Sequence, residues 1–148
     1  KITLRRSKFF NNKGINFTYV HNALEKNVGK VLSVVKLDGK KEADLKDIGT
    51  KLAMHIAASA PMAIDKNGIK QNIIDKELEI IKEELKNTGK KENMIDKISQ
   101  GKLNKFISDN TLLNQIWIMD TKKKVKDVLK SDVKVIDFIR FKVGEGIE

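Results

Sequence analysis

The sequence predicts an α+β protein in which a small antiparallel sheet packs on helices and an antiparallel helical hairpin is inserted. Apolar and polar residues alternate over residues 15–22, and a β-branched apolar run fills residues 30–37. Two amphipathic helical stretches joined by a short turn fill residues 70–108. We therefore expect a discontinuous α/β core, residues 1–69 and 109–148, which carries the hairpin.

The hairpin is predicted by a heptad seam in its first arm. The seam residues are spaced by four, three and four positions: Ile74, Leu78, Ile81 and Leu85. Thr88-Gly89 ends this arm, because glycine adopts the left-handed conformation after a helix at little cost. The second arm is expected from about Glu92. Its apolar side consists of Met94, Ile95, Ile98, Leu103, Phe106 and Ile107.

Gly101 lies inside the second arm, where a glycine costs about 1 kcal/mol relative to alanine. We therefore expect close backbone packing at this position. Periodicity leaves two interpretations of the hairpin open. It is either a plain helical pair within a larger core, or a coiled-coil arm that projects to contact a partner.

The core is expected to begin with a strand over residues 2–10, where alternation is weak, followed by the two strands named above in a meander. Residues 23–29 form a polar connection between these two strands. A helix over residues 42–60 carries a buried apolar stripe and ends at Pro61, the only proline. His55 lies beside this stripe, and we interpret it as a half-buried histidine with a local hydrogen bond rather than as a ligand.

After the hairpin, residues 112–119 are an apolar stretch that returns to the core. Asp120-Thr121 can cap a further helix, which ends near Ser131. Lys122, Lys123 and Lys124 fall in its first turn, the unfavourable end for cations, and this could mark a contact with an anionic partner. Residues 133–143 complete the chain with a strand.

The net charge of +10 is supplied mainly by lysine. Nucleic-acid surfaces favour arginine and aromatic side chains, but the chain has three arginines and an aromatic content of 5%. The lysines are therefore interpreted mostly as solvated faces, with an acidic protein or an RNA partner left open. No apolar run approaches the roughly 20 residues of a membrane span.

No residue pattern predicts catalysis. The chain has no cysteine, which excludes thiolate metal sites and cysteine nucleophiles. It contains no phosphate-binding GxxxxGK[ST] loop, no dinucleotide fingerprint and no GxSxG elbow. Its two histidines are far apart in sequence and do not propose a metal site. We expect no cofactor and no enzymatic activity, and an interaction module is the class that remains.

Several segments, taken in order, resemble translation elongation factor Ts. They are Tyr-Val-His-Asn at 19–22, Leu-Ala-Met-His-Ile-Ala-Ala-Ser-Ala-Pro at 52–61, Gly-Lys-Leu-Asn-Lys-Phe at 101–106 and Phe-Ile-Arg-Phe-Lys-Val-Gly-Glu-Gly-Ile-Glu at 138–148. The resemblance covers essentially the whole chain. It implies the second of the family's two related core subdomains, interrupted by an antiparallel coiled coil.

The family resemblance implies a guanine-nucleotide exchange factor that binds elongation factor Tu, in its GDP-bound or nucleotide-free form, and promotes GDP release. The implied location is the bacterial cytoplasm or an organellar matrix. The family's Thr-Asp-Phe-Val exchange motif does not occur in this sequence, and neither does its N-terminal three-helix domain. We therefore expect a fragment that lacks this motif.

The resemblance implies that Tyr19, His21 and Asn22 bind the partner. His21 would act by steric contact and hydrogen bonding, whereas the residues alone favour a strand-end histidine with a local hydrogen bond. Arg140, Gly144 and Gly146 match the family's ending and are interpreted as structural. The alternative function is a basic RNA-binding or dimerisation module. A homodimer is left open, and neither a membrane nor a nucleic acid is the expected partner.

Overall fold

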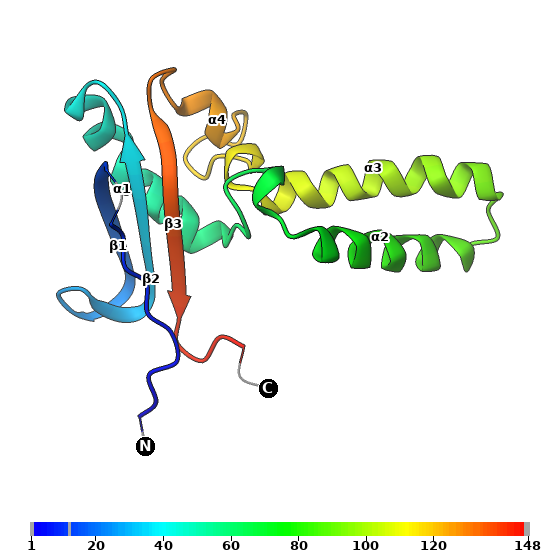
Figure 1. The fold of residues 1–148 in the computed structure, drawn as a ribbon, viewed down its shortest axis with the longest axis horizontal. Coiled ribbons are helices and arrows are strands. Elements are labelled where there is room, and N and C mark those ends of the chain that lie inside the picture. Colours follow the sequence, from blue (N-terminus) through cyan, green and yellow to red (C-terminus); the bar gives the residue numbers. More distant parts are fainter. Residues whose placement is uncertain (1, 12, 147–148) are drawn as a thin grey trace. The chain divides into compact units, whose positions relative to one another are not determined.

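The structure, a computed structural model, describes residues 2–11 and 13–146. The elements, in chain order, are β1 (Ile15–Glu25), β2 (Val28–Asp38), α1 (Glu42–Ser59), η1 (Lys66–Gly68), α2 (Gln71–Lys86), α3 (Glu92–Asn110), η2 (Leu112–Asn114), α4 (Val125–Val128) and β3 (Lys134–Lys142). The predicted α+β class is confirmed (Figure 1).

The chain forms two compact units. One comprises Lys1–Ala60 and Leu129–Glu148, and the other comprises Pro61–Val128. The hairpin lies within the second unit, together with the short segments that flank it. The boundaries predicted for an inserted hairpin, at residues 70 and 108, stay a prediction.

The sheet of the first unit is antiparallel, with β2 between β1 and β3 (Figure 1). Helix α1 packs against β1 and β2 and covers one face of the sheet. On this face Val35 and Leu37 are fully buried, and the buried hydroxyl of Ser33 donates a hydrogen bond to the carbonyl oxygen of Ala53 at 2.6 Å. The ring of Phe17 lies directly against Gly49 of α1.

The prediction of a strand over residues 2–10 is wrong, because the structure assigns no strand to this segment. The third strand of the sheet is β3. Side-chain contacts hold this segment instead. Arg6 lies over the ring of Phe141 at 4.9 Å, and Lys8 Nζ pairs with an Asp137 carboxylate oxygen at 2.7 Å. Alternation of apolar and polar residues gives a segment one apolar and one polar face. A strand also needs a neighbouring strand for its backbone hydrogen bonds, and the alternation does not show whether one is present.

The helix predicted over residues 42–60 is confirmed as α1. Ala60 ends it in the left-handed conformation, with φ of 44°, and its N–H donates to Ile56 O. His55 is fully buried rather than half-buried, because it belongs to the stripe that faces the sheet. Arg140 has the structural role expected of it, since its Nε donates to Ala57 O at 3.0 Å and its Nη1 pairs with Glu145 at 2.9 Å.

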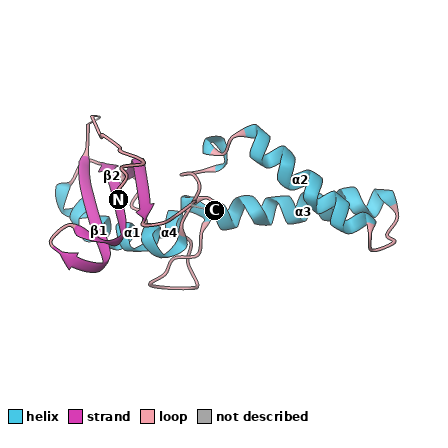
Figure 2. Cartoon of the chain, turned by 90° about the horizontal axis from the view of Figure 1, so that it is seen from below, coloured by secondary structure: helices cyan, strands magenta, loops and turns pink. Residues whose placement is uncertain are grey.

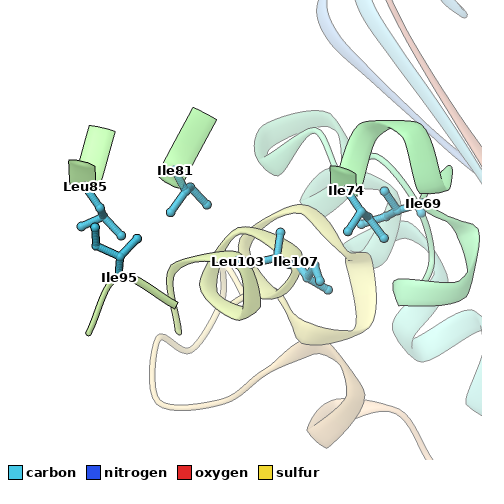
Figure 3. Packing of buried hydrophobic residues seen from close by; sticks show 8 residues of the cluster. Ile69, Ile74, Ile81, Leu85, Ile95, Leu103 and Ile107 are labelled. Carbon is cyan, nitrogen blue, oxygen red and sulfur yellow. The ribbon is translucent and has the colours of Figure 1, made fainter. Parts of the chain in front are cut away.

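The helical pair of the second unit has its own apolar core (Figure 3). Its buried residues are Ala63, Ile69, Ile74, Ile81, Leu85, Ile95, Leu103 and Ile107. Figure 3 shows Leu85 of α2 and Ile95 of α3 pointing toward each other near the turn. Two ion pairs also join the helices, Lys82 to Asp96 at 2.9 Å and Lys102 to Glu84 at 3.4 Å. The predicted seam is confirmed, with Leu78 partly buried at its edge.

Two expectations for the second arm are wrong. Nothing lies within 4 Å of the position that a Cβ on Gly101 would occupy, so this glycine does not mark a close backbone contact. Met94 is 50% exposed rather than part of the apolar side. It lies in the first turn of α3.

The helix expected after residue 120 is shorter than predicted, since only Val125–Val128 are helical.

Candidate partner-binding site

The candidate site lies in the C-terminal half of β1, beyond the part of this strand that packs against α1. Phe17, Tyr19 and His21 share one face of β1, because side chains two residues apart point the same way. This is the face toward α1, since Tyr19 pairs with Ser33 in the register of β1 and β2. Along the row, Phe17 packs on Gly49, Tyr19 is half-buried and His21 is exposed. Exposure to solvent therefore increases toward the end of this row of side chains, and the imidazole of His21 is its most exposed member.

Tyr19 and His21 contact each other. The hydroxyl oxygen of Tyr19 lies 3.2 Å from Nδ1 of His21, and the two rings are tilted with centroids 6.2 Å apart. When the hydroxyl donates to Nδ1, the neutral imidazole carries its proton on Nε2. Nε2 is then a hydrogen-bond donor that a partner can use, held in place by the tyrosine. This local bond is the one that the residues alone favoured, and it leaves a second ring nitrogen for a partner.

Asn22 interrupts the extended backbone of β1. Its φ is 51°, in the left-handed region that asparagine tolerates better than most residues. The register of β1 with β2 shifts between Ala23 and Glu25, as at a β-bulge. Bulges bend a strand and redirect the side chains that follow. The sequence signalled none of this, because a single Asn is a weak marker of a bulge.

The segment predicted as a polar connection is the end of the β1–β2 hairpin instead. The two strands run on to Glu25 and from Val28, and the turn needs only two residues. This extension exposes two apolar side chains that the sequence analysis missed, Leu24 at 75% and Val28 at 53%. We call this end of the β1–β2 hairpin the β1 tip; it includes Tyr19, His21, Asn22, Leu24 and Val28, of which Val28 lies on the face of the sheet away from α1, beside Lys30 and Leu32.

The β1 tip offers an aromatic pair, an amide and two apolar side chains, a combination suited to binding a protein surface. Within the described part of the chain, no group of three or more His, Asp or Glu side chains could hold a metal ion. None of the helices that the structure describes is long and apolar enough to span a membrane.

Comparison with known proteins gives a consistent family. The family model described as "Elongation factor TS" matches residues 1–145. Proteins named "Elongation factor Ts" are similar to this chain: 38% identical in Erythrobacter litoralis over 92% of this chain, 38% in Nitrobacter hamburgensis over 99%, and 35% in Orientia tsutsugamushi over 98%. These matches cover 47%, 51% and 49% of the respective relatives. The chain thus spans about half the length of the curated relatives it matches.

Proposed function

This chain belongs to the elongation factor Ts family, and we propose that it acts in translation elongation by binding the GTPase elongation factor Tu and favouring release of its GDP. The observation that carries the proposal is the family match over residues 1–145. The imidazole of His21 supports it, because it is exposed at the position where the family resemblance implies a contact histidine.

In exchange of this kind, GDP and the exchange factor are two ligands of the same GTPase, and the binding of one changes the affinity for the other. A factor can drive GDP off only if it binds the nucleotide-free GTPase more tightly than the GDP-bound form. No covalent step is needed, so the proposed role is not enzymatic. The coupling must then come from side chains that fit one conformation of the GTPase better than the other.

Within this proposal, the β1 tip is the contact surface. His21 Nε2 donates a hydrogen bond to the GTPase, Tyr19 fixes the tautomer and orientation of the imidazole, and Asn22 adopts the left-handed backbone conformation that follows them. Leu24, two residues after Asn22 and 75% exposed, adds apolar contact. Since the Thr-Asp-Phe-Val motif is not in this sequence, the exchange that this chain promotes would depend on binding through this surface.

The direct test is calorimetric titration of this chain into nucleotide-free and GDP-bound elongation factor Tu. We expect tighter binding to the nucleotide-free form and a loss of about 10-fold in that affinity for His21→Ala, the size expected when a hydrogen bond to a neutral partner and its packing are lost. Thr18→Ala is the matched control, because Thr18 is exposed on the same strand but points to the other face.

Equal affinity for both forms of the GTPase would refute the exchange role, whereas an unchanged affinity for His21→Ala would refute the site alone. The RNA-binding alternative makes a separate prediction. Retention of RNA by this chain should then fall steeply with added salt through counterion release. The proposed location is that of the translation machinery, in a bacterial cytoplasm or an organellar matrix.

A further inference from the structure

A second surface lies in the other unit, in the segment between η2 and α4. Residues 115–125 form a loop whose two sides meet at an antiparallel bridge between Ile116 and Lys124. Helix α4, which begins at the end of this loop, is labelled in Figure 2. Four backbone hydrogen bonds close the loop: Val125 N–H to Gln115 O at 3.0 Å, Trp117 N–H to Lys123 O at 2.8 Å, Asp120 N–H to Trp117 O at 3.2 Å and Lys123 N–H to Asp120 O at 3.0 Å. We call this segment the apolar loop. Its side chains are held on a fixed backbone.

The side chains of the apolar loop divide into two sets. Trp117 and Val125 are buried, with 4% and 0% exposure, and anchor the loop in the second unit. Ile116, Ile118 and Met119 are 60%, 39% and 49% exposed. Large apolar side chains that gather on a surface commonly mark an interaction site. The backbone hydrogen bonds join the two sides of the loop while these three side chains stay exposed.

Lysines lie close to these apolar side chains in the sequence. Lys122, Lys123, Lys124 and Lys126 follow the tip closely in sequence, with only Asp120 and Asp127 among them. Among the ion pairs of the residues that the structure describes, only Lys123 of these four has a carboxylate partner, Asp120 at 3.6 Å. The cations therefore remain available to carboxylates from outside. Lys122, Lys123 and Lys124 lie in the loop that precedes α4, rather than in the first turn of a longer helix as the sequence predicted, and Lys126 lies within α4.

The chemistry of the loop favours a protein over a nucleic acid. Bases are bound by stacking on aromatic side chains and phosphates are often held bidentately by arginine. The loop has no arginine, and its only aromatic residue, Trp117, is buried and cannot stack on a base. Two isoleucines and a methionine have no counterpart on a phosphate backbone, whereas an apolar groove on a protein accommodates them.

We propose that the apolar loop is a second docking element for the same GTPase. Ile116, Ile118 and Met119 enter an apolar groove on the partner, and the neighbouring lysines pair with carboxylates at the rim of that groove. The backbone hydrogen bonds fix the loop before binding and lower the entropy cost of association. This inference rests on the proposed function, which supplies the identity of the partner, but it involves residues outside the β1 tip.

The test compares two loop variants in binding to nucleotide-free elongation factor Tu, measured by fluorescence titration at low and high salt. Ile116→Ser with Met119→Ser removes apolar contact, and we expect a loss of about 10-fold or more in affinity at both salt concentrations. Lys122→Glu with Lys126→Glu should weaken binding at low salt and much less at high salt, because salt screens exposed charges. Circular dichroism confirms that each variant is folded.

Matched controls lie on the helical pair of the same unit. Ile80 is 42% exposed on α2, and Lys97 is an exposed lysine of α3. Ile80→Ser and Lys97→Glu make a single change of each chemical kind away from the loop and should leave the affinity within about 2-fold, as expected for surface sites outside an interface.

The outcomes separate the two proposals. If the unsubstituted chain does not bind the GTPase, the proposed function fails and this inference fails with it. If His21→Ala weakens binding while both loop variants match their controls, the function stands and the docking loop is refuted. If the loop variants instead abolish self-association of the chain in sedimentation and leave the affinity for the GTPase unchanged, the loop contacts a second copy and the proposal is again wrong.

Discussion

Gly49→Ala is expected to destabilise the first unit although it replaces a helical glycine. A Cβ built on Gly49 would lie 2.2 Å from Cγ of the Phe17 ring and 2.4 Å from both Cδ atoms. Carbon atoms in ordinary contact are about 3.5–4.0 Å apart, so the ring must move by more than about 1 Å. Phe17 can move only by leaving its position against α1 or by displacing β1.

Two effects of opposite sign set the magnitude. Alanine favours the helix over glycine by about 1 kcal/mol. Overpacking costs typically about 1–3 kcal/mol, and a contact this short lies at the upper end of that range. The net effect is a loss of about 2 kcal/mol in the free energy of unfolding. For a domain of this size the loss corresponds to a decrease of about 4–8 °C in Tm.

The assay is urea denaturation followed by circular dichroism, with hydrogen exchange of the β1 and β2 amides as a local probe of the first unit. Gly101→Ala is the matched control, because nothing lies within 4 Å of its Cβ position. That variant should gain about 0.5–1 kcal/mol. Combining Gly49→Ala with Phe17→Ala should cost less than the sum of the two single changes. If Gly49→Ala stabilises the chain as Gly101→Ala does, the packing of Phe17 on α1 is refuted.

Ile81→Ala should destabilise the helical pair by about 2–5 kcal/mol, because it leaves a cavity at a side chain that is 5% exposed. Fluorescence of Trp117, the only tryptophan, reports unfolding of this unit, and a variant that unfolds like the unsubstituted chain would contradict the core in Figure 3. Asn22→Val should destabilise β1, whereas Asn22→Gly should be nearly neutral, because a β-branched residue is strained at a φ of 51°. Equal thermal stability of these two variants would contradict the left-handed conformation of Asn22.

The helical pair was predictable because its signals are local. The spacing of Ile74, Ile81 and Leu85 determines one face of a helix, and a short turn after Lys86 requires an antiparallel neighbour. The sequence also predicted α1 and the central strand, since each carries its own apolar pattern. The error at Gly101 has a different origin. A glycine indicates that no side chain is required, but it does not say whether anything lies close to it.

The sheet edge and the candidate site were harder to predict because they depend on partners distant in sequence. Residues 2–10 have the weak alternation of a strand, and the predicted meander placed them beside β1, but among the described residues β1 pairs only with β2 and the third strand is β3. His21 and Tyr19 share a face by simple alternation, so their proximity follows from the sequence. The left-handed conformation of Asn22 and the exposure of Leu24 do not. The exposure of Ile118 also escaped prediction, because an apolar run normally indicates burial.

The most direct test of the central claim is the rate of fluorescent GDP release from elongation factor Tu as this chain is added at rising concentration. The proposed exchange function predicts that release accelerates with concentration and that His21→Ala reduces the acceleration while Thr18→Ala does not. A release rate that stays at its spontaneous value, at concentrations where the chain is bound to the GTPase, would contradict the proposed exchange function.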